Sequence, residues 1–390
     1  MFLLVAVRLG AMLGLAAAAT AAVAVALSAP APAGAFSFST TPPAETAPGP
    51  KAVAITRRLA RYGPSVVVPS ADAPEFWQFR LDDQGPLSVV AKYSQTGTPG
   101  PSSAVGVADF NGDFADDLAI ANTGTNGVAI NLCIPSIGFF VPQFDANNQP
   151  GAYYPTGSRP VAVATGQLDN IADKRPDVAT ANDGDGTVTT WRNGADGKLR
   201  DRADAKVGDN PRALVMGDFG SAIVERDVAV AVAGEDRVVV LERRGPDLNE
   251  IASVKAGEGP SEIVQGDFDE DHRRDLMVAN PLGQLTLLVG KSGGGFEPAK
   301  RVLDGPNVSA MAAADFDRDG KADLALANSG DGTVTVLLGK GDGTFPRALV
   351  YPTGARPQAV AVGDITGDGR PDLAVTNLGT TTVRALLNRP

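Results

Sequence analysis

The chain has 390 residues, of which 43% are hydrophobic and 20% charged, and its 45 glycines and 29 prolines favour many turns and short strands over long helices. Acidic residues outnumber basic ones by 45 to 34, a net charge of −11. This balance argues against a nucleic-acid partner, because phosphate binding needs a basic face. The single cysteine, Cys133, excludes an intramolecular disulfide, and the single histidine, His272, excludes a His-rich zinc site.

The first 35 residues have the layout of a secretory signal peptide. Arg8 precedes an uncharged apolar stretch from Leu9 to Leu27, and small residues with A-x-A-like sites follow. We expect cleavage after Ala35 and a secreted, cell-surface or periplasmic protein. The alternative is an uncleaved segment that anchors the chain, since the stretch is long enough to span a membrane. Residues 36–50 are rich in Pro, Ser and Thr and predict a disordered linker before a folded body of residues 51–390.

From residue 51 the sequence repeats about every 49 residues. A Gly-x-x-Pro or Gly-Pro marker occurs seven times, and each of the last six is followed by short apolar runs, four in a full repeat, that are bounded by Gly, Asn and Asp turns. Such runs read as β-strands. Four strands in a repeat of this length are typical of a β-propeller blade. We therefore predict an all-β, seven-bladed β-propeller, with six blades as the alternative.

The two ends of the repeat region suggest how the ring closes. The last repeat, Pro357 to Pro390, has three strands, whereas residues 51–60 resemble a lone fourth strand. We expect residues 51–60 to complete the last blade, which would remove exposed sheet edges. The first blade, from Pro64 to about Thr98, has no acidic loop and is short enough for three strands only.

Four repeats carry a nine-residue acidic cluster between their first two apolar runs. Side-chain oxygens stand at positions 1, 3, 5 and 9, and the backbone carbonyl of position 7 can turn inward. Read as positions 1, 3, 5, 7 and 9, the four sets are Asp109, Asn111, Asp113, Ala115 and Asp117; Asp267, Asp269, Asp271, Arg273 and Asp275; Asp315, Asp317, Asp319, Lys321 and Asp323; and Asp364, Thr366, Asp368, Arg370 and Asp372. Calcium takes six to eight hard oxygens in irregular geometry. We therefore predict about four Ca²⁺ sites, with the basic side chains at position 7 pointing away.

The sequence also bears on two other interpretations of these clusters. An EF-hand needs a Glu at position 12 and flanking helices, but position 12 is apolar here and the flanks read as strands. Asp-rich hairpin turns that bind no ion remain the alternative. Two further loops have decayed: Asp169, Asp173 and Asp177 form a candidate weak site, and the loop from Asp218 to Asp227 is expected to be metal-free.

The residue at position 6 predicts that the four loops bind calcium with different affinities. This position usually needs a left-handed backbone, which Gly adopts without strain. Gly320 and Gly369 fit, whereas Phe114 and His272 are less favourable. We expect the loop that starts at Asp315 to bind calcium most tightly and the loop that starts at Asp109 least tightly.

At these residues the chain resembles the FG-GAP/VCBS repeat family, the propeller type of the integrin α-subunit head. The stretches "DFDRDGKADLALAN" and "DITGDGRPDLAVTN" carry the resemblance, which covers roughly residues 51–390. It implies calcium-binding loops on one face of a propeller, in proteins that are mostly secreted or surface-exposed and often bind proteins or glycans through the opposite face. Phe114, His272, Thr366 and the two decayed loops depart from the family pattern.

These observations lead to two functional hypotheses. The first is a secreted or surface-exposed, calcium-binding module that binds or adheres to a protein or glycan ligand. The alternative is an extracellular polysaccharide lyase or hydrolase on the same propeller, because carboxylate pairs are available although no catalytic constellation is visible. Two carboxylates in a cleft outside the calcium loops would favour the enzyme. Trp77, Trp191, Tyr153 and Tyr154 could line a glycan site or serve the core and rim.

Overall fold

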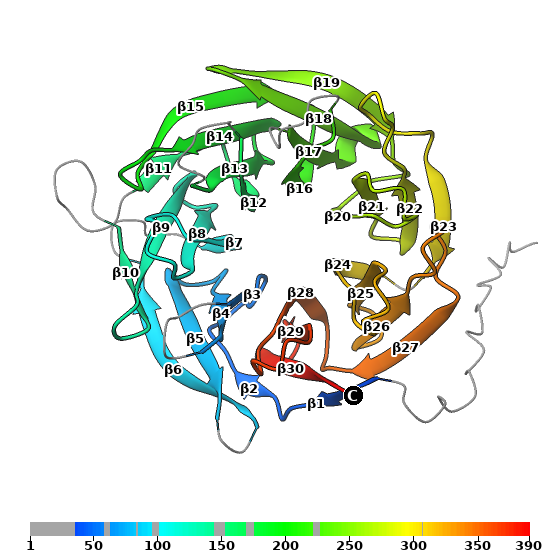
Figure 1. The fold of residues 1–390 in the computed structure, drawn as a ribbon. Helices are drawn as coiled ribbons and strands as arrows, with labels where there is room; N and C mark the ends of the chain where they lie inside the picture. Colours follow the sequence, from blue (N-terminus) through cyan, green and yellow to red (C-terminus); the bar gives the residue numbers. More distant parts are fainter. Residues whose placement is uncertain are drawn as a thin grey trace, which may run out of the picture. The chain divides into compact units, whose positions relative to one another are not determined.

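The computed structural model describes residues 36–57, 63–82, 85–95, 101–143, 153–168, 175–220, 227–305 and 307–390. The expected signal peptide, residues 1–35, lies outside them. Within the described part, the chain forms strands and one short 3₁₀ turn, η2 at Ala233–Glu235. The strands form seven sheets that are arranged around a central axis (Figure 1), and neighbouring strands within a sheet are antiparallel. The prediction of seven blades is confirmed.

The blades are numbered here in chain order. Blades 1 to 3 contain β3 Ala54–Thr56, β4 Ser65–Pro69, β5 Glu75–Leu81 and β6 Leu87–Ser94; β7 Ser102–Ala108, β8 Asp117–Asn122, β9 Gly127–Ile134, β10 Phe139–Pro142 and β11 Tyr153–Pro155; and β12 Pro160–Gly166, β13 Asp177–Asn182, β14 Thr187–Asn193 and β15 Leu199–Lys206. Blades 4 and 5 contain β16 Pro211–Gly217, β17 Asp227–Val232, β18 Arg237–Arg244 and β19 Asp247–Lys255; and β20 Glu262–Gly266, β21 Asp275–Ala279, β22 Gln284–Leu288 and β23 Lys300–Asp304. Blades 6 and 7 contain β24 Val308–Ala314, β25 Asp323–Asn328, β26 Thr333–Leu338 and β27 Arg347–Pro352; and β28 Pro357–Gly363, β29 Asp372–Asn377, β30 Thr382–Arg389, β1 Ser37–Thr40 and β2 Ala44–Glu45.

The second strand of every blade is buried along its whole length. Successive side chains of a strand point to opposite faces, so such a strand must pack against a neighbour on each side. In β8, Leu118 and Ile120 pack toward blade 1, whereas Ala119 and Ala121 pack toward blade 3. Seven apolar clusters result, one between each adjacent pair of blades, and together they form the core of the ring.

The ring closes differently from the prediction. The described part of residues 51–60, which is 51–57, does not complete blade 7: β3 pairs with β4 as the innermost strand of blade 1, which therefore has four strands rather than three. The outer edge of blade 7 comes instead from residues 36–50, where β1 and β2 both pair with β30. The prediction of a linker at 36–50 is therefore wrong, and the propeller starts with this segment. Phe38, 7% exposed, anchors it by packing its ring 5.7 Å from that of Phe316 and 5.3 Å from that of Tyr351.

Candidate metal centres

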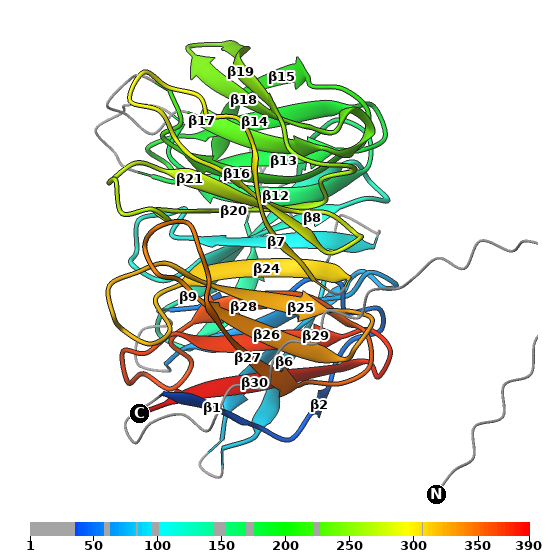
Figure 2. The same cartoon turned by 90° about the vertical axis from the view of Figure 1, so that its right-hand side faces the viewer.

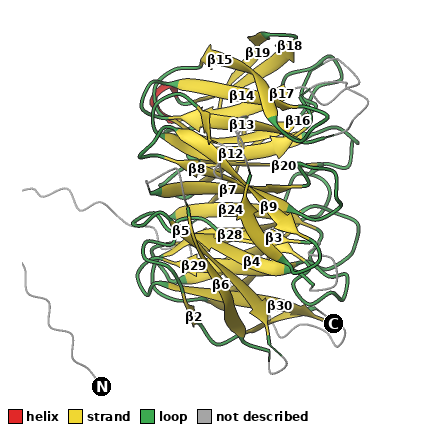
Figure 3. Ribbon diagram, turned by 90° about the vertical axis from the view of Figure 1, so that its left-hand side faces the viewer, coloured by secondary structure: helices red, strands yellow, loops and turns green. Residues whose placement is uncertain are grey.

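All four acidic loops occupy the same place in their blades. Each follows the innermost strand, β7, β20, β24 or β28, and ends where the second strand begins. Side views show the strands running between two faces of the ring, with connecting loops gathered on each face (Figures 2 and 3). Because the four loops connect equivalent strand ends, they lie on one face, as the sequence predicted. We call this face the acidic face.

Each loop turns twice through the left-handed backbone region. Position 6 has φ 66° at Phe114, 65° at His272, 89° at Gly320 and 80° at Gly369, as expected. Position 4 is also left-handed in all four loops, at Gly112, Glu270, Arg318 and Gly367, and this was not foreseen. Four of these eight residues are not glycine, and each such residue costs roughly 1–2 kcal/mol.

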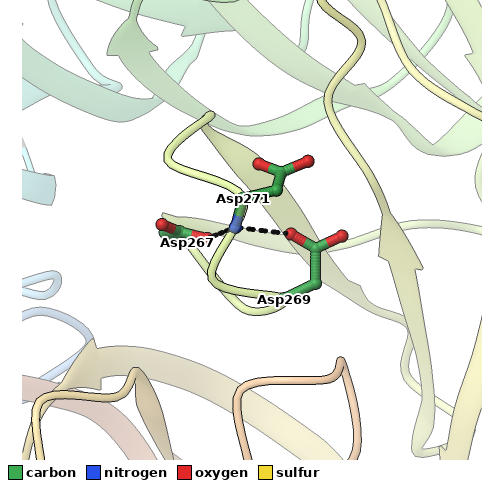
Figure 4. Close-up of side chains that lie close together, drawn as sticks. All are labelled: Asp267, Asp269 and Asp271. Carbon is green, nitrogen blue, oxygen red and sulfur yellow. Dashed lines mark hydrogen bonds between the residues drawn. The ribbon is translucent and has the colours of Figure 1, made fainter.

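Backbone N–H groups inside each loop draw the carboxylates together. In the loop that starts at Asp315, the Asp315 carboxylate accepts hydrogen bonds from the N–H groups of Asp319 at 3.0 Å and Gly320 at 2.9 Å. In the loop that starts at Asp267, the N–H of Asp271 donates to Oδ1 of Asp267 at 3.1 Å and of Asp269 at 3.3 Å (Figure 4). The same donors occur in all four loops, so the carboxylate at position 1 is held over the turn.

Two of the loops bring three carboxylates together. One carboxylate oxygen from each of Asp267, Asp269 and Asp271 lies within 4.8 Å of the others, and the same holds for Asp315, Asp317 and Asp323. Burial, together with the neighbouring negative charges, raises the pKa of Asp269 and of Asp317. Ionised carboxylates in this arrangement repel one another, and a divalent cation among them would remove the repulsion. The donor set is oxygen only, which fits calcium or magnesium rather than a soft metal.

Position 9 has a structural role that sequence reasoning missed. In the Asp315 loop, Oδ2 of buried Asp323 accepts the N–H of Phe316 at 2.7 Å, and Oδ1 accepts the N–H of Gly339 at 2.8 Å. Asp117, Asp275 and Asp372 make the same pair of bonds. Burial raises the pKa of Asp117 and Asp323 to about 7 and of Asp275 to about 6. The carboxylate therefore ties the loop to the end of the third strand of its blade.

In the two decayed loops the last aspartate, at position 9, still accepts hydrogen bonds from backbone N–H groups. Asp177 accepts the N–H groups of Leu168 and Asn193, each at 2.7 Å, and Asp227 accepts the N–H of Phe219 at 2.9 Å. The last aspartate thus keeps its backbone bonds in both loops, although their other positions depart from the acidic pattern. Asp169 and Asp173, the other members of the candidate weak site, lie outside the described residues. The metal-free state expected for the loop from Asp218 to Asp227 stays a prediction.

The residue at position 2 is the other recurring feature of these loops. Phe110, Phe268, Phe316 and Ile365 are buried and pack into the interface with the following blade. A periodic aromatic or aliphatic residue directly after the first aspartate was the available sequence signal. Each acidic loop is therefore attached to an interface between blades, so ordering the loop also orders that interface.

The basic side chains at position 7 do not all point away, contrary to the prediction. The Arg273 guanidinium forms an ion pair with the Asp271 carboxylate, and Nζ of Lys321 lies 3.8 Å from Oδ2 of Asp319. His272 Nδ1 lies 3.6 Å from Oδ2 of Asp267. A position 7 cation placed against position 5 partly neutralises the cluster and would compete with a bound metal ion.

Position 3 distinguishes the remaining two loops. Asn111 donates from Nδ2 to Oδ2 of Asp113 at 3.0 Å, and Thr366 donates from Oγ1 to Oδ1 of Asp364 at 3.3 Å. Each replaces a carboxylate with a neutral group that also offers an oxygen. These two loops therefore offer one carboxylate fewer at positions 1, 3, 5 and 9 than the other two, and fit a divalent cation with one charged ligand fewer.

The four candidate glycan-binding aromatic residues are not assembled into one site. Tyr154 and Trp191 pack against each other, with ring centroids 5.6 Å apart, in the interface between blades 2 and 3. Trp77 lies in blade 1, where Nζ of Lys92 sits 3.6 Å from its ring centroid. Tyr153 lies in β11 and donates its hydroxyl to the Thr125 carbonyl. Each residue serves its own blade or interface.

Comparisons with known proteins agree with this architecture. Residues 267–326 and 315–375 each match the family model of the FG-GAP-like repeat. No curated protein matches the chain. A crystal structure of BBS1N in complex with ARL6DN, soaked with mercury, has a TM-score of 0.63 at 11% sequence identity, over 91% of this chain and 98% of that one. A lead-soaked crystal of the same complex gives a TM-score of 0.62 at 12% identity, with the same coverage. At these identities the similarity concerns the fold alone.

Proposed function

Because the chain is a seven-bladed propeller that carries FG-GAP-like repeats at residues 267–375, we propose that it is a secreted or surface-exposed binding module whose acidic loops hold calcium. The convergence of three carboxylates in each of two equivalent loops carries this proposal. Hard oxygen ligands in an irregular loop suit calcium better than magnesium, which demands near-ideal octahedral geometry. Position 1, 3, 5 and 9 side chains would hold the ion, together with the position 7 carbonyl.

Calcium would act on stability rather than on chemistry. A site whose Kd lies ten-fold below the ambient calcium concentration adds on the order of 1.4 kcal/mol to the free energy of unfolding. Extracellular calcium modules often bind at 0.1–1 mM, so the ion suits a protein outside the cytoplasm. Since each loop leads into an interface between blades, about four bound ions would keep neighbouring blades in register.

The N-terminal sequence supports secretion. Residues 1–35 have the composition of a signal peptide. Among the residues that the structure describes, no helix is long and apolar enough to cross a membrane.

The ligand would be a protein or a glycan that docks on the face opposite the acidic loops. A protein partner is consistent with the similar structure, which was crystallised as a complex of BBS1N with ARL6DN.

Three measurements on the full-length chain test this proposal. Expression with its own N-terminus should yield protein in the medium or periplasm that starts at Phe36. Thermal melts should rise in calcium and much less in magnesium. A panel of glycans and surface proteins, presented in calcium, should give a saturable ligand. Retention in the cytoplasm, or melts that calcium leaves unchanged, would contradict the proposal, and release of unsaturated or reducing ends from a polysaccharide would support the enzyme instead.

A further inference from the structure

The face opposite the acidic loops carries a large cavity at the centre of the ring. The acidic loops follow the last residues of the innermost strands, whereas this cavity is lined by the first residues of those strands and by the turns between second and third strands. Its volume is about 1100 Å³. We call it the channel mouth. This is slightly above the range for small-molecule sites, which is about 300–1,000 Å³.

A repeated irregularity aims side chains into the channel mouth. Five innermost strands have a β-bulge at the same register, each with one extra residue just after the strand begins. The extra residues, Ser103, Val161, Arg212, Ser309 and Gln358, all line the cavity. A bulge re-aims a side chain at the expense of regular pairing and is common beside functional sites. Here the bulged residues of five blades all line the same cavity.

The channel mouth is basic although the chain as a whole is acidic. Lys51, Arg159, Arg212 and Arg356 line it, with Glu262 as the single acidic lining residue. Burial raises the pKa of Glu262 to about 8. The channel mouth therefore holds four cations, although the net charge of the whole chain is −11. Such a local reversal of sign draws anions in and holds them.

One aspartate with a buried side chain, Asp183, holds two of these cations in place, and the net charge of the mouth stays positive. Oδ2 of Asp183, whose side chain is 3% exposed, lies 3.0 Å from Nη2 of Arg159 and 3.7 Å from Nη1 of Arg212. Its Oδ1 is buried and accepts no hydrogen bond within the described residues. One carboxylate thus orients two guanidinium groups. Lys51 and Arg356 form no ion pair in the described part of the chain, so the four cations outnumber the carboxylates of Asp183 and Glu262, and an excess of at least two positive charges remains at the mouth.

Two of the arginines occupy a backbone conformation that suits glycine. Arg159 and Arg356 each have φ 53° and directly precede the proline that starts an innermost strand. The equivalent residue in blade 5 is Gly259, with φ 56°, so the fold accepts glycine at this position. Left-handed non-glycine residues are strained and cluster where a side chain is needed. Placing arginine twice at such a position indicates that the guanidinium groups themselves are used.

The lining chemistry selects one class of ligand. Arginine binds carboxylates through paired hydrogen bonds, and the serine, threonine, asparagine and glutamine residues of the mouth can serve the backbone of a peptide. None of the described lining residues is aromatic, so the mouth lacks the stacking surface on which sugar rings usually pack. We propose that the channel mouth binds an acidic segment of a partner protein, with Asp or Glu side chains held by Arg356, Arg212 and Lys51. This inference rests on the proposed binding function and names the ligand.

Fluorescence anisotropy of the full-length protein in calcium tests the inference. The probes are a fluorescein-labelled oligoglutamate peptide and its oligoglutamine counterpart. Oligoglutamate should bind and oligoglutamine should not, and added salt should weaken binding because the contacts are charged. Arg356→Gly removes one cation and suits the local backbone, so it should fold and weaken binding about ten-fold.

Arg318→Gly is the matched control. Arg318 has φ 63°, is exposed and lies on the acidic face at position 4, outside the proposed calcium ligands, so the same substitution there should leave peptide affinity within about two-fold. Absence of oligoglutamate binding, or equal losses in the two variants, would overturn the inference. So would an oligogalacturonate that binds and depends on Arg356 when the peptide does not. Calcium-dependent melts of the same samples separate the outcomes: an intact calcium shift without peptide binding rejects the channel-mouth ligand and leaves the calcium module standing.

Discussion

Replacing Asp319 with Ala removes the position 5 carboxylate from the loop that starts at Asp315. The Asp319 side chain is 39% exposed, its Oδ1 accepts the N–H of Lys321 at 3.0 Å, and its Oδ2 lies 3.8 Å from Nζ of the same lysine. Both contacts are local and solvent-accessible. In chelator the substitution should therefore cost no more than about 0.5–1 kcal/mol in free energy of unfolding.

In calcium the same substitution should remove one bound ion. If calcium is ten-fold above the Kd of the site, the lost contribution is about 1.4 kcal/mol. Unfolding entropy near 2.1 cal/mol/K per residue gives roughly 0.7 kcal/mol/K for a domain of about 350 residues. The melting temperature in calcium should then fall by about 2 °C more than it falls in chelator.

The assay compares thermal melts in calcium and in chelator for the wild type, Asp319→Ala and Asp331→Ala. Asp331 is exposed in the turn between β25 and β26 of the same blade, so the control removes the same charge away from the loop. It should show no calcium-specific loss. Equal shifts for Asp319→Ala in the two buffers, with an unchanged ion count by calorimetry, would refute the assignment of Asp319 as a ligand.

Three further predictions concern other parts of the fold. Burial raises the pKa of Asp227 to about 6 from 3.8, so ionisation of this carboxyl opposes folding. As the pH rises from about 4 to about 6, the free energy of unfolding of the wild type should fall by up to about 3 kcal/mol relative to that of Asp227→Asn, with no further fall above pH 6. Denaturant titrations that give a constant difference between the two proteins across this range would contradict the prediction. Phe38→Ala should cost about 3–5 kcal/mol by opening the seam between blades 6 and 7, and a loss below about 1 kcal/mol would show that β1 does not close the ring. Arg273→Ala should tighten calcium binding to its loop about three-fold, because it frees Asp271 from an ion pair; unchanged or weaker binding by calorimetry would argue against that competition.

The repeat and the loop positions were predictable because their signals are local. Turn residues recur at a fixed phase, and the left-handed backbone at position 6 follows from its place in the loop. Strand alternation between those turns is also a short-range pattern. These features depend on neighbours within a few residues, so a single sequence carries them.

Ring closure could not be read in the same way, because it depends on which distant strands pair. Ser37 pairs with Arg389, and neither segment carries a sequence signal that identifies the strand with which it pairs. The alternation of Phe36 and Phe38 was a strand signal, but the surrounding Pro, Ser and Thr residues outweighed it. Chain distance also hid the role of position 9, since Asp323 receives the N–H of Gly339 from the end of a later strand.

Sequence reasoning was least accurate for the long charged side chains. Arg273 was expected to point away from its loop because only its carbonyl was assigned a role, yet its guanidinium turns back to Asp271. The positive charges of the channel mouth were not foreseen either. Arg159, Arg212 and Arg356 are separated by about fifty residues or more in sequence, and only the closed ring brings them around one cavity.

Calcium stoichiometry of the full-length wild-type protein tests the central claim most directly. Isothermal titration into metal-depleted protein, with elemental analysis of the dialysed sample, counts the ions that the acidic face holds. About four calcium ions per chain should bind, in preference to magnesium. A chain that binds no calcium in the millimolar range would show that the acidic loops are hydrogen-bonded turns alone.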